Sequence, residues 1–425
     1  MKFSLPYGQG HLQLELPPPW QADWIAPAPV AAAHDPAGAV IAALTAPVGG
    51  VRLEDFRGAR SAAIAINDKT RPVPHDQLLP PLLARLEALG LPPAAITLLI
   101  ATGAHAPLAA EEFERVLPAA IIARYPVRSH DCDDEANLRY LGQTQRGTPV
   151  WMNRHFVAAE LRLVVGNVEP HQFQGFSGGA KSAAIGLGGR ATINANHALL
   201  RDPRARPCSY ADNPMRQDVE EIGQLAGIHF TLNAVLTPEK ALAHAVAGAP
   251  RAVMESAMPL ARAIFEVAVV APYDLVIVAA GGHPKDLNLY QAQKALAHAS
   301  LAVKEQGLII LVAACPEGLG SREYERWMLD HGPRSIPEVF ARFEQEGFRV
   351  GPHKALLLAR DVRRLRGVWL VSEMPPSLVR QVLLTPASLD EALRAALELL
   401  PSEARIGVMP VGNATVPRLE ESAMN

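Results

Sequence analysis

The stretch HQFQGFSGGAKSAAIGLGGRATINANH (171–197) places two histidines and a lysine around a glycine-rich loop. Three interpretations are open: a phosphate-binding loop, a metal site, or an ordinary strand–loop–helix with polar residues. A Walker A loop needs a glycine directly before its lysine, so that the backbone can wrap the phosphates. Here Ala180 precedes Lys181, and the glycines do not follow the dinucleotide-binding spacing either. A phosphate of another ligand could still be held by backbone N–H groups of the turn formed by Ser177, Gly178 and Gly179.

Three histidines are candidates for acid/base chemistry or metal binding. His105, His171 and His197 are separated by 66 and 26 residues, so no pair has the spacing of ligands on one helix. Spacing alone therefore does not indicate a metal, and a single loop histidine is more often a hydrogen-bonding residue. A neutral imidazole can nevertheless act as a base near neutral pH or as a metal ligand. Lys181 could be a point charge or, if buried, a covalent anchor.

Two further groups have the chemistry of carboxylate binding. Arg71 lies in DKTRP, just past an apolar run, and an arginine fork suits a carboxylate. The alternative is a surface salt bridge to Asp68. In the second half, Tyr290, Gln291 and Lys294 share one face of an expected helix, which is plausible for a binding site. A solvated helix start is the alternative there.

The elements that must position these residues are short apolar runs, rich in Val, Ile and Leu and without clean alternation. Such runs are typical of strands covered on both faces. Helical patterns such as 81–90 and 291–300 lie between many of them, so we expect an α/β fold with mainly parallel sheets flanked by helices. The expected strands are 61–67, 96–102, 161–168, 274–280, 307–314 and 366–373.

The polar motifs all follow these expected strands, which is where ligands bind in open α/β sheets. Because 425 residues exceed the usual size of one core, we expect two domains, at 1–268 and 269–425. Three of the motifs fall in the first domain and two in the second. The sequence therefore predicts a site assembled from both halves of the chain.

Charge, apolar stretches and cysteine content argue against several classes of protein. The formal net charge is −3 without a basic stripe, so no nucleic-acid partner is expected. The longest apolar stretch is interrupted by charges and a proline, and no signal peptide or membrane span is expected. The three cysteines, Cys132, Cys208 and Cys315, form no CxxC pair, which favours a reducing cytoplasm over disulfides.

Taken together, the motifs resemble the nickel-pincer lactate racemase family. They occur in the family's order, and several are long and unusual. The matching segments are LPYGQGHLQLELP near the start, DKTRP (68–72), TGAH (102–105), PH with GFSGGAK (170–181), TINANH (192–197), NPMRQD (213–218) and GHPKDLNLYQAQK (282–294).

The resemblance implies an isomerase that inverts C2 of a 2-hydroxy acid. Lys181 would carry a covalent nickel-pincer nucleotide, a pyridinium-3-thioamide-5-thiocarboxylic acid mononucleotide made by dedicated biosynthesis proteins. His197 would bind its nickel. His105 and His171 would be the two acid/base residues, while hydride passes to the cofactor and back through a 2-keto acid. The substrate carboxylate would be held by Arg71, Gln291 and Lys294, with Asp68 and Tyr290 close by.

The resemblance also implies a domain arrangement. The N-terminal domain would bind the cofactor and carry the catalytic residues, the C-terminal domain would contribute substrate-binding residues, and the active site would lie in the cleft between them. The alternatives are another redox or elimination reaction of a hydroxy acid on the same scaffold, or a non-catalytic carboxylate-binding protein. The presence of both His105 and His171 argues against the last, because binding alone needs no pair of bases.

This chain departs from the family pattern at a few positions. Gln174 stands where a small residue is expected, and Ile185-Gly186 replaces a usual Pro-Gly step. His353 falls roughly where lactate racemases carry an aromatic residue beside the substrate. We therefore expect a substrate larger or more polar than lactate.

Overall fold

The computed structural model describes residues 1–71 and 73–420. Pro72, the last residue of the DKTRP motif, and residues 421–425 at the end of the expected second domain lie outside the described residues. The chain forms two compact units, one of residues 29–264 and one of residues 1–28 with 265–425. No helix within 1–71 or 73–420 is both long and apolar enough to cross a membrane.

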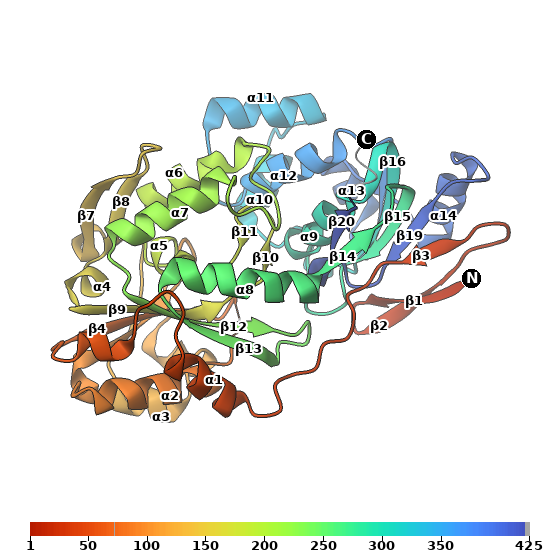
Figure 1. The fold of residues 1–425 in the computed structure, drawn as a ribbon. Coiled ribbons are helices and arrows are strands. Elements are labelled where there is room, and N and C mark those ends of the chain that lie inside the picture. The colour runs from red at the N-terminus through yellow and green to blue at the C-terminus, as the bar shows by residue number, and fades with distance from the viewer. Residues whose placement is uncertain (72, 421–425) are drawn as a thin grey trace. The chain divides into compact units, whose positions relative to one another are not determined.

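The unit of residues 29–264 is built on one six-stranded sheet (Figure 1). Neighbouring strands run parallel, except that the last two in sequence pair antiparallel. In spatial order the strands are β13 (Leu242–Gly248), β12 (Phe230–Leu236), β9 (Leu161–Asn167), β4 (Ala62–Asn67), β5 (Ile96–Ala101) and β6 (Val127–Ser129).

Helices cover both faces of this sheet. Along β4, Ile64 and Ile66 belong to one buried core, whereas Ala63 and Ala65 belong to another, as the two-residue period of a strand requires. The first core is closed by α1 (Pro36–Thr45), α2 (His75–Ala88) and α3 (Ala119–Arg124), and the second by α4 (Arg154–Ala158), α5 (Lys181–Ala184) and α7 (Pro214–Leu225). The apolar runs without alternation are thus confirmed as strands buried on both faces.

The second unit contains another six-stranded sheet, with every neighbouring pair parallel. A hairpin of β1 (Lys2–Tyr7) and β2 (Gly10–Glu15) covers one face, where Leu5, Leu14 and Leu16 are buried. Helices α9 (Leu289–Ala299) and α14 (Leu389–Glu398) also pack against the sheet. The spatial order is β18 (Thr385–Pro386), β17 (Gly367–Val371), β16 (Val303–Val312), β15 (Tyr273–Ala279), β19 (Ile406–Met409) and β3 (Ala22–Trp24).

The position of residues 1–28 differs from the domain division expected from the sequence. The expected boundary at 268 lies four residues after the junction at Ile264, but residues 1–28 were expected in the N-terminal domain. They pack with the C-terminal residues because β3 adds an edge strand beside β19 and the hairpin buries three leucines there. The local sequence of residues 1–28 does not reveal this pairing, because the strand that pairs with β3 is at 406–409.

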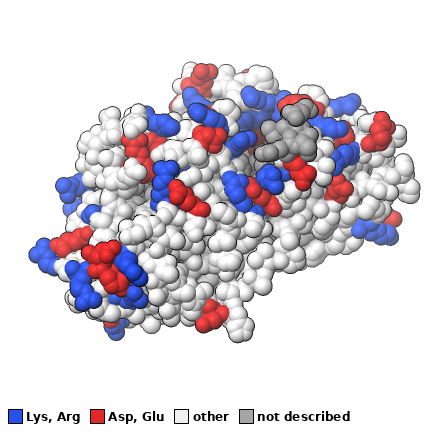
Figure 2. Space-filling view, viewed as in Figure 1, with Lys and Arg blue, Asp and Glu red and all other residues white. Residues whose placement is uncertain are grey.

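Charges of both signs are interspersed on the face drawn in Figure 2, where Lys and Arg mostly lie beside Asp and Glu. Among the ion pairs are Arg60 with Glu160 and Arg190 with Asp133, each at 2.6 Å. Exposed pairs of this kind contribute about 0–1 kcal/mol each. They bear on solubility and add little to the stability of the fold.

Candidate active site

The site in the unit of residues 29–264 is built where neighbouring parallel strands end. Asn67 is the last residue of β4, and its Nδ2 donates to Oδ1 of Asn167, the last residue of β9, at 3.2 Å. Oδ1 of Asn67 accepts from the Ser182 hydroxyl at 2.9 Å. On β12, Asn233 Oδ1 accepts from the Gly179 N–H at 2.7 Å. Three adjacent strands therefore fix the glycine-rich turn and the start of α5 through asparagine side chains.

His105 is held by Asp68. Its Nδ1 lies 2.8 Å from Oδ2 of Asp68, whose other oxygen accepts from the Thr70 hydroxyl at 2.7 Å. Burial of Asp68 opposes ionisation, but the hydrogen bonds from His105 and Thr70 outweigh it, so the pKa of this carboxyl lies below its usual value. The carboxylate fixes the tautomer with hydrogen on Nδ1, which leaves the Nε2 lone pair of His105 available as a base.

His171 and His197 both contact the ring of Phe173. Ring centroids of Phe173 are 4.6 Å from His171 and 5.6 Å from His197, both in edge-on geometry. His171 ends the short strand β10 (Pro170–His171), and its Nδ1 accepts from the Gln174 N–H at 3.3 Å. The loop thus brings together two histidines that are 26 residues apart in sequence.

His197 has the properties of a metal ligand. It lies in the last turn of α6 (Arg190–Ala198), where its Nδ1 donates to the Ile193 carbonyl at 2.9 Å. Burial, followed by the positive charge of Lys181, holds the pKa of His197 well below its usual value. The ring is therefore neutral at pH 7, with its lone pair on Nε2, which is the form that binds metals.

Lys181 begins α5 and is buried, with 8% of its surface exposed. The preceding Gly178 and Gly179 have φ of 82° and 58°, which side chains rarely adopt. A Cβ on either would lie 2.6 Å from a neighbouring side-chain atom, so the turn requires both glycines. Ser177 stabilises the same turn, since its hydroxyl donates to the Asn167 carbonyl at 2.9 Å. A buried amine beside a neutral, metal-competent His197 fits a lysine-linked cofactor that carries a metal.

Arg71 is exposed, and its positive charge contributes to the lowered pKa values of both Asp68 and His197. Among the described residues it makes no ion pair with Asp68, whose oxygens are bonded to His105 and Thr70. The surface salt bridge considered from the sequence is therefore not formed. A cationic fork near a neutral histidine is suited to an anionic substrate group.

The residues Tyr290, Gln291 and Lys294 share α9 in the other unit, as expected. Asn288 caps this helix by accepting from the Gln291 N–H at 3.1 Å. The buried Lys354, on α12 (His353–Val362), has its Nζ 4.5 Å from the centre of the Tyr290 ring. His353 contacts the same ring edge-on at 6.1 Å. The surroundings of Tyr290 thus include a cation and an imidazole.

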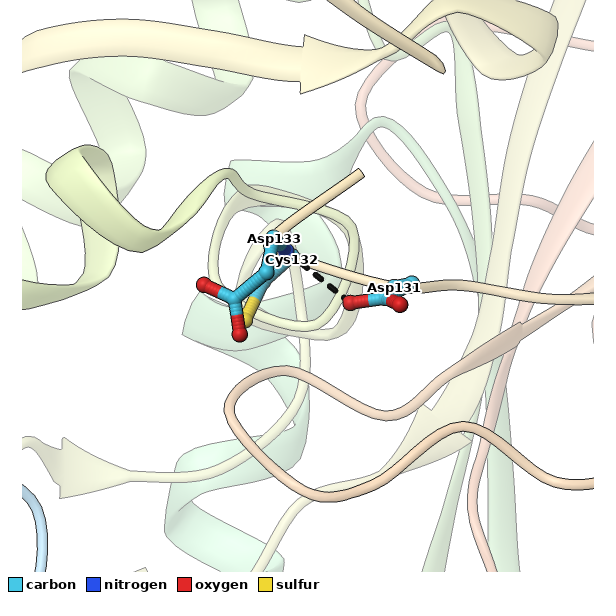
Figure 3. Close-up of side chains that lie close together, drawn as sticks. All are labelled: Asp131, Cys132 and Asp133. Atoms are coloured by element: carbon cyan, nitrogen blue, oxygen red, sulfur yellow. Dashed lines mark hydrogen bonds between the residues drawn. The ribbon is translucent and has the colours of Figure 1, made fainter. Parts of the chain in front are cut away.

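A second place with metal-binding residue types is the turn Asp131-Cys132-Asp133 (Figure 3), whose ligand atoms lie within 4.8 Å of one another. Burial raises the pKa of the Cys132 thiol to about 11, so it is protonated at pH 7. Asp133 is paired with Arg190, and its N–H donates to Asp131 at 2.9 Å. These contacts are those of an ordinary turn, in which the Asp133 carboxylate is already paired with Arg190.

Comparison with known proteins shows which family this chain resembles. The family model of the lactate racemase N-terminal domain matches residues 7–207, and that of the lactate racemase C-terminal domain matches residues 269–416. The chain belongs to the lactate racemase family. The family resemblance drawn from the motifs is thereby confirmed, and so is the α/β fold with mainly parallel sheets flanked by helices.

Individual relatives agree along most of the chain. A lactate racemase of Thermoanaerobacterium thermosaccharolyticum is 29% identical over 88% of this chain and 89% of its own. One of Lactiplantibacillus plantarum is 29% identical over 86% and 87%. The solved lactate racemase apoprotein from Thermoanaerobacterium thermosaccharolyticum superposes with a TM-score of 0.90 at 28% identity, covering 98% of this chain and all of that one. A Thermotoga maritima protein, 19% identical with a TM-score of 0.65, shares the fold.

Several residues of this lactate racemase family member that contact the expected site residues were not singled out from the sequence. In the unit of residues 29–264 these are Phe173 and the asparagines Asn67, Asn167 and Asn233, and in the other unit Lys354 beside Tyr290. The motif NPMRQD (213–218) was recognised without any role for its residues. Gln174, noted as a departure, is buried and donates to Asn196 Oδ1 at 2.9 Å, which ties the loop to α6.

Proposed function

We propose that this protein is a racemase or epimerase that inverts C2 of a 2-hydroxy acid. The observation that carries the proposal is that His105 and His197 are both oriented through Nδ1, which donates to the Asp68 carboxylate in the first and to the Ile193 carbonyl in the second. One is held by a carboxylate, as a base should be, and the other is neutral beside a buried lysine, as a metal ligand should be. The names of the relatives support the same reaction class.

In the proposed reaction, the chain's own residues move protons and hold the substrate. Nε2 of His105 takes the proton of the 2-hydroxyl while the Cα–H leaves as hydride, so the substrate becomes a planar 2-keto acid. Arg71 binds the carboxylate through its guanidinium fork. When hydride returns to the opposite face of the carbonyl, His171 supplies the proton to the oxygen. Lys181 and His197 would hold a nickel-pincer nucleotide, which would supply the hydride acceptor.

The test is production of the protein in a host that makes the cofactor, followed by intact mass, nickel content and turnover of enantiopure 2-hydroxy acids. We expect an adduct on Lys181, bound nickel and racemisation, and we expect none of the three in the Lys181→Ala variant. His105→Ala and His171→Ala should keep the adduct and lose about 10²- to 10⁴-fold in turnover. Wild-type protein that has neither adduct nor nickel from such a host would refute the proposal.

We further propose a substrate larger or more polar than lactate. His353 and the Lys354 ammonium beside Tyr290 support a pocket for an additional polar or anionic group. A panel should compare lactate with 2-hydroxy acids that carry a second carboxylate or extra hydroxyls. The highest kcat/KM should belong to one of the polar acids, and fastest turnover of lactate would contradict the idea.

A further inference from the structure

The start of α7 carries polar residues that the reaction does not use. Asn213, Arg216 and Asp218, all from the NPMRQD motif, have 0% of their surface exposed. A buried charge is costly unless it is paired and fully hydrogen-bonded. These buried side chains therefore need hydrogen-bond partners. The partners lie in the segments that carry the proposed catalytic groups.

The guanidinium of Arg216 hydrogen-bonds both a carboxylate and the glycine-rich turn. Its Nε donates to Oε1 of Glu220 at 2.8 Å, one helical turn further along. Its Nη1 donates to the carbonyls of Phe176 and Gly178, each at 3.1 Å. A Cβ at Gly179 would lie 2.8 Å from Nη2, so the guanidinium fits because that position is glycine. One planar group thus fixes two peptide units of the turn that ends at Lys181.

The neighbouring motif residues hold the segments on either side. Asn213 caps α7 by accepting from the Arg216 N–H at 3.1 Å, and its Nδ2 donates to the Phe173 carbonyl at 3.0 Å. Asp218 accepts from Nδ2 of Asn196, the residue before His197, at 2.9 Å. One helix start therefore contacts the loop of His171, the turn before Lys181 and the helix of His197.

We propose that Arg216 is a positioning residue that sets the geometry of the turn between His171 and Lys181. The inference rests on the proposed function for the roles of those two residues. Lysine cannot replace Arg216, because an ammonium lacks the planar fork that reaches Glu220 and two carbonyls at once. Misplacement by about 1 Å can cost about 100-fold in rate, so loss of the fork should appear in turnover.

The experiment compares wild type, Arg216→Lys and Tyr210→Phe, all from a cofactor-making host. Tyr210→Phe is the matched control: it removes the hydroxyl that bonds Glu220 at 3.1 Å but leaves both bonds to the turn. The readouts are the thermal midpoint, the Lys181 adduct by intact mass, kcat per mole of adduct, and hydrogen exchange of residues 171–181 in protein from a host without the cofactor. A purely structural role would reduce the folded fraction and leave kcat per adduct unchanged.

For Arg216→Lys we expect kcat per adduct to fall about 10- to 100-fold. We also expect exchange at 171–181 to be at least about tenfold faster. For Tyr210→Phe, kcat per adduct and the exchange rate at 171–181 should both stay within about twofold of wild type. If Arg216→Lys does not fold, the double variant Arg216→Gln, Glu220→Gln removes both buried charges together and is read in the same way. A folded variant with wild-type kcat per adduct and wild-type exchange would overturn the proposal. Wild type without an adduct would instead refute the proposed function, so the two failures are distinguishable.

Discussion

At the scale of single residues, the contact between Asp68 and His105 decides how the site can work. From the sequence, Asp68 was expected beside the substrate carboxylate. The structure places its carboxylate on Nδ1 of His105 at 2.8 Å. A carboxylate in that position orients the imidazole and stabilises its protonated form, which is what a base needs when it takes a proton.

Replacing Asp68 by Asn should therefore impair proton transfer more than binding. The amide can present its N–H to Nδ1 and favour the tautomer with hydrogen on Nε2, which is not a base. We expect kcat to fall about 10²- to 10⁴-fold, with a smaller change in KM. The measurement is steady-state kinetics, normalised to the Lys181 adduct.

Thr70→Val is the matched control for this variant. It removes the 2.7 Å bond to Asp68 but leaves the carboxylate on His105, so its kcat should fall by less than about tenfold. Equal kcat values for Asp68→Asn and wild type would show that His105 does not depend on this carboxylate.

The candidate site residues that could be identified from the sequence were those that stand in an unusual local sequence. His105, His171, Lys181 and His197 stood in glycine-rich or polar loops after apolar runs. Asn233 could not be found this way, because it lies in the middle of β12 and its role is a bond to Gly179, 54 residues earlier in the chain. A polar residue inside a strand has no distinctive local pattern, and its function depends on a long-range contact.

At the scale of elements, helix α9 is fixed at both ends. Asn288 caps its start, and near its end Nδ1 of His298 donates to the Gly412 carbonyl at 2.8 Å. Burial lowers the pKa of His298 to about 4. The helix that carries Tyr290, Gln291 and Lys294 is therefore anchored by a histidine that must stay neutral.

This histidine makes the fold sensitive to acid. Its pKa is about 6.5 in the unfolded chain and about 4 in the folded protein. As pH falls from 6.5 to 4, the unfolded chain binds a proton that the folded protein does not, so the free energy of unfolding falls by about 1.4 kcal/mol per pH unit for this group. The loss is complete below pH 4, where both states are protonated.

His298→Gln keeps a donor for the Gly412 carbonyl and removes the titration. We expect its free energy of unfolding, measured by urea at pH 5, 6 and 7.5, to depend less steeply on pH than that of wild type. His34→Gln serves as the reference for removing an exposed histidine. Parallel curves for wild type and His298→Gln would contradict the expectation.

Helix boundaries show where local patterns mislead. The sequence predicted a helical pattern at 81–90, which begins at Pro81. In the structure α2 begins at His75, and Pro80 and Pro81 lie inside it. The preceding turn is stabilised by burial of His75, Leu78 and Leu79 in the core, and such tertiary packing is not visible in a local window.

At the scale of the whole molecule, the two mainly parallel sheets could be predicted because six of their inner strands lie in continuous apolar runs, namely β4, β5, β9, β15, β16 and β17. The assignment of residues 1–28 could not, because β3 has only three residues and pairs with a strand near the other end of the chain. Asp23 shows the same long reach, since its carboxylate is bonded to Tyr273 and Arg405.

Leu14→Ala tests the role of the N-terminal hairpin in the unit that contains residues 265–425. Leu14 is 1% exposed in the core with Leu275 and Ile310, so the change should lower the free energy of unfolding by about 2–5 kcal/mol. Hydrogen exchange should increase in β15 and β16, with β4 and β9 unchanged. Leu399→Ala, at a side chain 40% exposed, should stay within about 0.5 kcal/mol of wild type. Faster exchange spread equally over both sheets would contradict this view.

The pairing of β3 with β19 also sets an order of events during synthesis. Asp23 and Arg405, which are bonded in the finished protein, are 382 residues apart, and at about 5–20 residues per second the ribosome needs tens of seconds to make that length. All of residues 29–264 emerge in this interval, so their sheet can form on the nascent chain. Leu5, Leu14 and Leu16 stay exposed at least until β15 and β16 are made, and β3 has no partner strand until β19 is made. Nascent-chain binding by chaperones should therefore concentrate on this N-terminal segment.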